Sequence, residues 1–181
     1  MSVEEMHPQE PGAFHIRHPA QGIIDGVLGG HGEVLNSTIM TPWAIPEDLE
    51  TYDYDPELAK TMLDEAGYPV NDDGFRFKLR HRPAPWGEYT QLWAEYFAQA
   101  MKEIDIDVEI LTNDAPGFLN GVYRDHDFDT ANGWHQFRSD PAVSTTVWLR
   151  SGQPAGSPWT NQFGWQDDEV DQLIDDAASE L

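Results

Sequence analysis

The stretch DFDTANGWHQFRSDP, residues 127–141, brings an indole, an imidazole, a phenyl ring and a guanidinium close together in the chain. Trp134 offers a rigid face for stacking on a sugar ring, a peptide plane or an aromatic group. Arg138 can pair with a carboxylate, and His135, Phe137 and Asp140 complete the candidate ligand-binding set. The structural alternative is that Trp134 packs in a core or at a hinge, and that the chain simply bends at Asp140-Pro141.

Metal and nucleophile chemistry have weaker support. His126, Asp127 and Asp129 could hold a cation, which gives a metal-dependent hydrolase as an alternative function. His15 and His18 are one helical turn apart, but the prolines around them favour an accidental pair. The sequence from Asp53 starts like a calcium loop, yet Leu58 stands where such a loop needs glycine. We therefore expect no metal site, no cofactor and no enzyme.

The charge of the chain is strongly negative. It has 33 Asp and Glu residues against 10 Lys and Arg, a formal net charge of -23. A nucleic-acid partner is disfavoured, because a phosphate backbone requires a basic face. The excess of carboxylates favours a protein that stays soluble in concentrated salt, where screening removes self-repulsion, over an ordinary acidic surface.

The start of the chain predicts neither a membrane anchor nor an export signal. No apolar run approaches the roughly 20 residues that span a bilayer, and residues 1–19 lack the basic and apolar parts of a signal peptide. The absence of cysteine leaves the redox compartment open. Residues 1–21 are rich in Pro, His and Glu and predict a poorly ordered arm.

Helices alternating with strands must position the candidate residues. Asp55 predicts a helix cap with Pro56 at the first helical position and Gly67 as the stop. Alternation of Phe75, Phe77 and Leu79 with basic residues predicts a half-buried strand over 75–82. The further predicted elements are a helix over 87–104, a strand over 106–112, a short helix over 116–125, a strand over 128–135 and a helix over 167–181.

The spacing of apolar residues also predicts which helix faces are buried. In the first helix the inward residues are Leu58, Met62, Leu63 and Ala66; in the second they are Leu92, Trp93, Phe97, Ala100, Met101 and Ile104; in the last they are Val170, Leu173, Ile174 and Ala177. Strands separated by helices predict an α/β fold with a mixed or parallel sheet flanked by helices.

Five stretches in this order resemble the C-terminal lobe of family 5 extracytoplasmic solute-binding proteins, the peptide, nickel and oligosaccharide receptors of ABC importers. They are YDPELAKTMLDEAGYP, GFRFKLRHR, EYTQLWAEYFAQAMKEIDIDVEI, FLNGVYRDHDFDTANGW and FGWQDDEVDQLIDDA. In the third stretch Asp105 stands where the family usually has glycine. The resemblance covers residues 22–181 and implies a periplasmic-binding-protein-like lobe.

The resemblance implies binding, with two lobes closing on a solute and docking on an ABC permease outside the cytoplasm. In peptide receptors of the family an aspartate three residues after the tryptophan holds the ligand's amino group, and here that residue is Phe137. Unless Asp140 takes that role, a neutral or anionic solute such as an oligosaccharide fits better than a cationic peptide end. Four further aromatic residues would suit sugar stacking beside Trp134: Phe137, Trp148, Trp159 and Trp165.

Family members are longer than this chain. They carry an N-terminal lobe before the matching segment and a further stretch after it, so we expect a truncated piece whose partner is the missing N-terminal lobe of the same protein. A protein-interaction fragment without a solute site is the other alternative.

Overall fold

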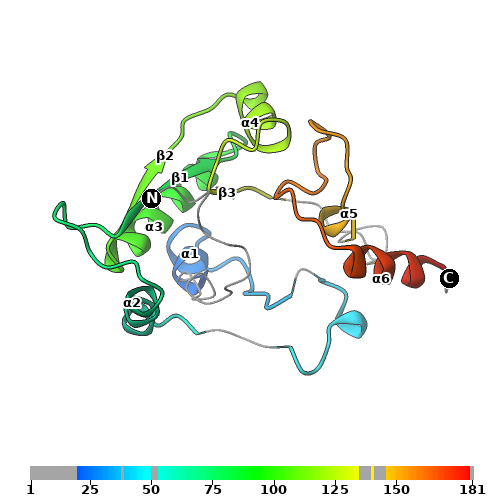
Figure 1. The fold of residues 1–181 in the computed structure, drawn as a ribbon, viewed down its shortest axis with the longest axis horizontal. Coiled ribbons are helices and arrows are strands. Elements are labelled where there is room, and N and C mark those ends of the chain that lie inside the picture. Colours follow the sequence, from blue (N-terminus) through cyan, green and yellow to red (C-terminus); the bar gives the residue numbers. More distant parts are fainter. Residues whose placement is uncertain (1–19, 38, 50–52, 135–139, 141–145, 180–181) are drawn as a thin grey trace. The chain divides into compact units, whose positions relative to one another are not determined.

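The computed structural model describes residues 20–37, 39–49, 53–134, 140 and 146–179. Its elements, which can be followed in Figure 1, are α1 (Ala20–Gly26), the 3-10 helix η2 (Pro42–Ala44), α2 (Pro56–Glu65), β1 (Phe77–Pro83), α3 (Glu88–Glu103), β2 (Ile106–Ile110), α4 (Ala115–Tyr123), β3 (Thr130–Asn132), α5 (Thr146–Leu149) and α6 (Asp168–Ser179). Among the described residues the predicted strands and helices are all present, and most are a little shorter than expected. The arm predicted over 1–21 lies almost entirely outside the described residues; its last residues begin helix α1, where no helix was predicted.

The chain divides into two compact units. Of the described residues, the first unit contains 20–34, 53–113 and 128–133, with α1, α2, α3 and the three strands. The second contains 35–37, 39–49, 114–127, 134, 140 and 146–179, with η2, α4, α5 and α6. The chain therefore leaves the first unit after β2 and returns to it for β3.

The strands of the first unit form a parallel sheet in the order β2-β1-β3, as far as the described residues show. β1 is central: Phe77 pairs with Ile106 of β2, and His81 pairs with Thr130 of β3. The mixed-or-parallel prediction is thus resolved in favour of parallel strands. Since parallel strands end at one edge, β1 and β3 present their carboxyl ends together.

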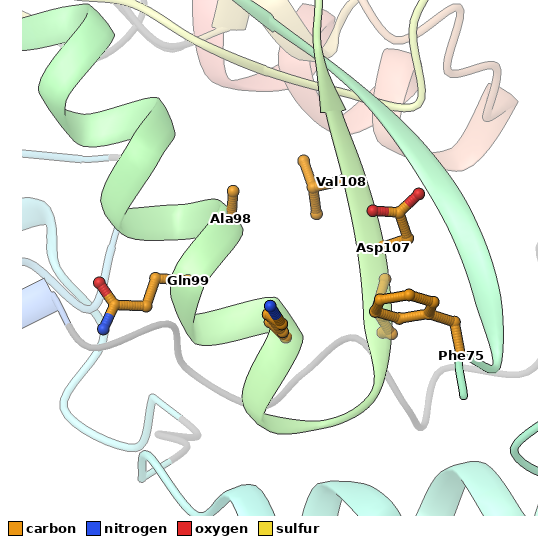
Figure 2. A pocket seen from close by; sticks show the side chains of 7 residues that line it. Phe75, Ala98, Gln99, Asp107 and Val108 are labelled. Atoms are coloured by element: carbon orange, nitrogen blue, oxygen red, sulfur yellow. The ribbon is translucent and has the colours of Figure 1, made fainter. Parts of the chain in front are cut away.

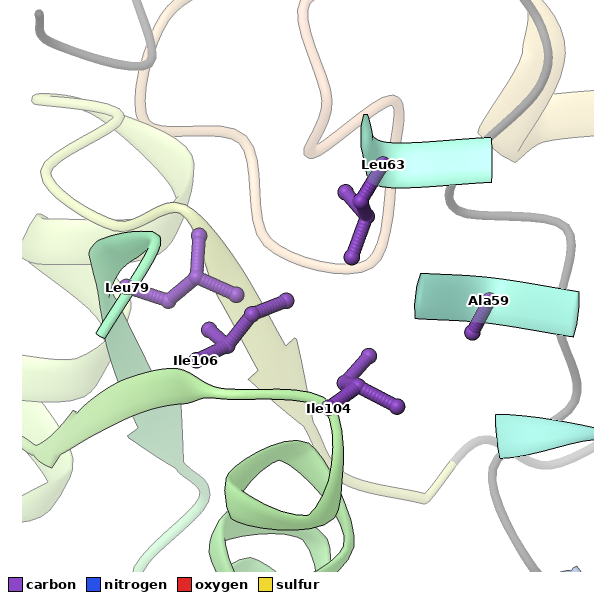
Figure 3. Packing of buried hydrophobic residues seen from close by; sticks show 5 residues of the cluster. All are labelled: Ala59, Leu63, Leu79, Ile104 and Ile106. Carbon is purple, nitrogen blue, oxygen red and sulfur yellow. The ribbon is translucent and has the colours of Figure 1, made fainter. Parts of the chain in front are cut away.

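A hydrophobic core lies between α2, β1 and β2. It consists of Ala59, Leu63, Leu79, Ile104 and Ile106, which Figure 3 shows with their side chains converging. Tyr68, Phe77, Met101 and Val108 pack around it. Because apolar area removed from water is the main source of stability, this cluster holds α2 and the loop after α3 against the sheet.

Helix α2 begins as predicted, and of its predicted inward residues Leu63 is buried and Met62 half-buried, whereas Leu58 and Ala66 are exposed. The carboxylate of Asp55 accepts a hydrogen bond from the N–H of Leu58 at 2.9 Å, and Pro56 is the first helical residue. The buried residues are Ala59 and Leu63, four apart and therefore on one face, whereas Leu58 is 51% exposed. The inward assignment of Leu58 is wrong, because the small Ala59 allows closer approach to the core.

The other inward assignments are partly correct. Ala100 and Ile104 are buried in or beside α3, but Leu92 lies at the exposed edge of that helix. On α6 the assignment of Leu173 as inward is wrong, since it is 62% exposed. Within its own unit α6 packs on α5, which has only four residues and covers only a narrow part of the apolar face.

Candidate functional site

The predicted site residues begin directly where β3 ends. Thr130–Asn132 form the strand, Gly133 follows, and Trp134 comes next with 43% of its surface exposed. Asp140 is also exposed. His135, Phe137 and Arg138 lie outside the described residues, so the grouping of the five candidates stays a prediction.

Backbone hydrogen bonds fix the end of β3 to the residues after β1. The N–H of Ala84 donates to the carbonyl of Asn132 at 2.9 Å. Thr90 at the start of α3 donates its hydroxyl hydrogen toward the carbonyl of Ala84 at 2.5 Å, and that hydroxyl also lies 2.7 Å from the carbonyl of Gly87. The side-chain amide of Asn132 donates to the carbonyl of Thr90 at 3.1 Å. This network joins β1, β3 and α3 at the edge from which Trp134 departs.

His81 is the buried centre of that edge. Its Nδ1 lies 2.8 Å from the hydroxyl of Thr130, and its Nε2 lies 2.8 Å from the side-chain oxygen of Asn132. The ring packs on Phe97 of α3 with 4.8 Å between centroids. Burial lowers the pKa of His81, while its hydrogen bond to Asn132 acts in the opposite direction.

Sequence reasoning assigned no role to His81, Thr90 or Asn132. A signal was present in the alternation of β1, because His81 follows Leu79 by two residues and therefore points to the same buried face. A histidine in that position must have hydrogen-bonding partners, since buried polar groups are rarely left without them. The partners themselves come from β3 and could not be read from local sequence.

The start of β3 is held by Asp129. Its carboxylate accepts a hydrogen bond from the N–H of Arg80 at 2.6 Å and lies 3.8 Å from Nε of the same arginine. The N–H of Asp129 donates in turn to the carbonyl of Arg80 at 3.0 Å. This carboxylate therefore has a structural role in strand pairing.

The arrangement of His126, Asp127 and Asp129 gives no support to the hydrolase alternative. His126 lies with Nδ1 3.0 Å from the carbonyl of Gln162, and Asp129 is engaged by Arg80. Over the ranges that the structure describes, no group of three His, Asp or Glu side chains is placed to hold a metal ion.

The second unit carries several exposed aromatic residues. Trp159 packs on Tyr123 with 6.1 Å between ring centroids, and Trp159 itself is 44% exposed. Trp165 is 48% exposed, and the side chain of Asn161 both donates to its carbonyl and accepts from its N–H. Trp148 in α5 is half-buried. Trp159 and Trp165 therefore have enough open surface for stacking, as the sugar-binding hypothesis requires.

An open pocket of about 270 Å³ lies in the first unit between α3 and β2. Figure 2 shows Ala98 and Gln99 from the helix on one side, and Asp107 and Val108 from the strand on the other. Its lining includes Ile106, which marks the amino end of β2.

Known proteins resemble this chain over most of its length. The sequence profile of the bacterial extracellular solute-binding proteins, family 5 Middle, matches residues 14–157. Di/tripeptide-binding protein 1 of Pseudomonas aeruginosa is 27% identical over 161 residues, which cover 87% of this chain but 29% of that protein. In the part of the chain that the structure describes, no helix is long and apolar enough to cross a membrane.

Solved structures show the same fold. An oligopeptide-binding protein of Thermotoga maritima with mannohexaose bound superposes with a TM-score of 0.71 at 24% identity, covering 90% of this chain and 33% of that one. A protein of Agrobacterium tumefaciens R10 in complex with agropinic acid gives 0.69 at 20% identity, with 91% and 33% covered. The fold is therefore α/β of the periplasmic-binding-protein type, and the chain spans about a third or less of these relatives. Because the family profile covers more than half of its residues, the chain belongs to family 5 of the bacterial extracellular solute-binding proteins.

Proposed function

We propose that this chain is part of the solute-binding component of an ABC importer, which captures a small solute between two lobes and delivers it to the permease. Family membership supports the transport role, and the relatives named above are binding proteins rather than enzymes. Binding without bond breaking also agrees with the residue types at the candidate site, because an indole, a phenyl ring and a guanidinium are suited to stacking and charge pairing.

The observation that carries this proposal is the position of Trp134. In open α/β sheets, ligands bind in the crevice beyond the carboxyl ends of the strands. Trp134 follows the carboxyl end of β3 after a single glycine, and 43% of its surface is exposed. A core tryptophan would be more deeply buried, so a ligand-facing role is the better interpretation.

We assign the ligand contacts to the five residues that the sequence brings together. Trp134 and Phe137 would stack on a ring or a planar group, and Arg138 would pair with an anionic group of the solute. His135 and Asp140 would supply hydrogen bonds. The exposed rings of Trp159 and Trp165 could extend the stacking surface for a longer solute.

The solute class that fits best is neutral or anionic. The Pseudomonas relative is named for di- and tripeptides, while the Thermotoga relative holds mannohexaose. Phe137 stands where a peptide receptor needs a carboxylate for the ligand's amino group, and a phenyl ring cannot replace that charge. Oligosaccharides have no cationic amino group that needs a carboxylate, and their C–H faces can stack on aromatic rings.

The chain spans less than a third of its Pseudomonas relative, so we propose that solute capture requires the rest of a two-lobe protein. Residues 22–181 would form part of the C-terminal lobe, and residues 1–21 an arm beside it. The partners would be the N-terminal lobe of the same protein, the solute and the permease subunits. The site of action would be outside the cytoplasm, as for the family.

Titration calorimetry tests this function. In a fusion protein, the 181-residue chain would replace the matching segment of the Pseudomonas relative, so that both the N-terminal lobe and the stretch after the segment are present, and this fusion would be titrated with mannohexaose and with dialanine. We expect saturable binding of mannohexaose by the fused protein, lost in Trp134→Ala and retained in Trp43→Ala, which removes a tryptophan that is 79% exposed on η2. A folded fusion that binds neither solute would contradict the proposal.

A further inference from the structure

The imidazole of His81 connects β1 to β3 through both of its nitrogens. Nδ1 lies 2.8 Å from Oγ1 of Thr130, the first residue of β3, and Nε2 lies 2.8 Å from Oδ1 of Asn132, the last. The residue is only 3% exposed. One side chain thus holds the whole length of the strand that precedes Trp134.

The hydrogen bonds of Asn132 place a proton on Nε2 of the ring. Asn132 uses its Nδ2 to donate to the carbonyl of Thr90, so its Oδ1 faces His81 and must accept from Nε2–H. Nδ1 accepts from the hydroxyl of Thr130 when the ring is neutral, and it can donate to the same hydroxyl oxygen when the ring is protonated. Both forms satisfy the hydrogen bonds, so what opposes an imidazolium at this position is the burial of its charge, since the residue is only 3% exposed.

Among the residues that the structure describes, no carboxylate pairs with the ring of His81, so an imidazolium would lack a counter-charge from them. Arg80 and Arg82 flank His81 on β1, and the alternation of a strand points them to the opposite face. The neighbouring carboxylates are engaged elsewhere: Asp129 by Arg80, and Glu109 of β2 by Lys78 at 3.1 Å. The titratable side chains on the adjoining helix α3 are Glu88, Tyr89, Glu95, Tyr96, Lys102 and Glu103, and its acidic ones are exposed to solvent.

We infer that His81 is a positioning residue for the candidate solute site: its neutral ring holds the end of β3 against β1, and protonation of the ring releases that end together with Gly133 and Trp134. The inference rests on the proposed function only in calling Trp134 a ligand contact. It gives the site a built-in response to acid outside the cell. No bond is broken, and the proton comes from solvent.

The sign of the response follows from the direction of the pKa shift. Burial lowers the pKa of His81 in the closed strand, whereas an opened strand exposes a ring with the ordinary pKa of about 6.5. Below pH 6.5 the opened state therefore binds more protons than the closed state, and falling pH favours opening. The opening equilibrium rises by up to about tenfold for each unit by which the two pKa values differ.

Hydrogen exchange measured by NMR on the 181-residue chain tests this without any solute. The reporter is the N–H of Ala84, which donates to Asn132, with exchange expressed relative to the intrinsic rate at each pH. We expect its protection in the wild type to fall progressively as the pH is lowered from 7 to 5. In His81→Gln, whose amide can both donate to Asn132 and accept from Thr130, we expect protection without this pH dependence.

His31→Gln is the matched control, because it removes an exposed histidine of the same unit and should behave as the wild type. Direct titration of the His81 ring nitrogens in the wild type provides a second measurement that needs no variant. The inference is overturned if His81→Gln loses protection in acid as the wild type does, or if the ring protonates while the Ala84 amide stays equally protected. Failure of the solute titrations described above would leave these results unaffected.

Discussion

Nη1 of Arg76 lies 2.5 Å from Oδ1 of Asp64, which joins the residue before β1 to helix α2. The arginine side chain is only 3% exposed, whereas that of Asp64 is 59% exposed. The same guanidinium donates to the carbonyls of Tyr68 and Ile104, at 2.7 and 3.2 Å. Arg76 therefore satisfies backbone groups at the ends of two helices as well as an ion pair.

Replacement of Arg76 by Met should lower the free energy of unfolding by about 3 kcal/mol, because the buried carbonyl of Ile104 and the half-buried carbonyl of Tyr68 lose their donor. Asp64→Asn should lower the free energy of unfolding by about 1 kcal/mol or less, because an ion pair with a solvent-exposed carboxylate contributes little. The guanidinium of Arg76 keeps its two carbonyl partners in this variant. Urea denaturation followed by circular dichroism measures both. Equal losses for the two variants would show that the ion pair, rather than the carbonyl contacts, dominates.

At Asp105, in contrast, we predict a substitution that raises the free energy of unfolding. Its backbone has φ 62°, in the left-handed region that glycine enters freely and that side-chain-bearing residues enter at a cost. The family usually has glycine at this turn between α3 and β2. Asp105→Gly should therefore raise the free energy of unfolding by up to about 1 kcal/mol, a gain reduced by the loss of the carboxylate that lies 3.8 Å from Nε of Arg76. Asp107→Gly, two residues later within β2, is the control and should lower it.

The sequence predicted the order and type of elements well because their signals are local. The cap at Asp55, the proline after it and the apolar spacing of α3 all lie within single elements. The burial of Arg76 was not predicted: simple alternation placed it on the exposed side of a strand, but β1 begins only at Phe77. Its acceptors come from α2 and the end of α3, which are remote in sequence.

For the candidate site, too, only features with a local sequence signal could be predicted. Trp134 and Asp140 could be named from a short stretch, and the strand before them was expected. The hydrogen-bond network at the carboxyl end of β3 could not be predicted, since His81, Thr90 and Asn132 come from three elements and meet only through the register of β1 and β3. The grouping of Trp134 with His135, Phe137 and Arg138 stays a prediction from sequence.

The charge of the chain predicts a strong dependence of stability on salt. With 33 acidic and 10 basic residues, the folded state is opposed by self-repulsion that salt screens. The screening length falls from about 30 Å at 0.01 M to about 3 Å at 1 M, so most of the gain should occur in that range. The melting temperature should rise steeply with KCl up to about 1 M. Sucrose, which carries no charge, is the control, and an equal rise in sucrose would argue against a charge effect.

Phe137→Asp should convert the solute preference. In peptide receptors of the family a carboxylate at this position holds the ligand's amino group, and a charge-assisted hydrogen bond contributes about 1.5–3 kcal/mol. In the two-lobe fusion, the variant should therefore bind dialanine at least about tenfold more tightly than the wild type, while N-acetyl-dialanine, which lacks the cationic group, should gain nothing. Asp140→Asn, made without the change at Phe137, tests the alternative that Asp140 supplies the anchor. If the wild-type fusion binds dialanine and this variant does not, Asp140 already holds the amino group and the neutral-solute hypothesis is wrong. Titration calorimetry measures dialanine binding by all three proteins and N-acetyl-dialanine binding by the wild type and Phe137→Asp. It is done at pH 7, where the amino group of dialanine is mostly protonated.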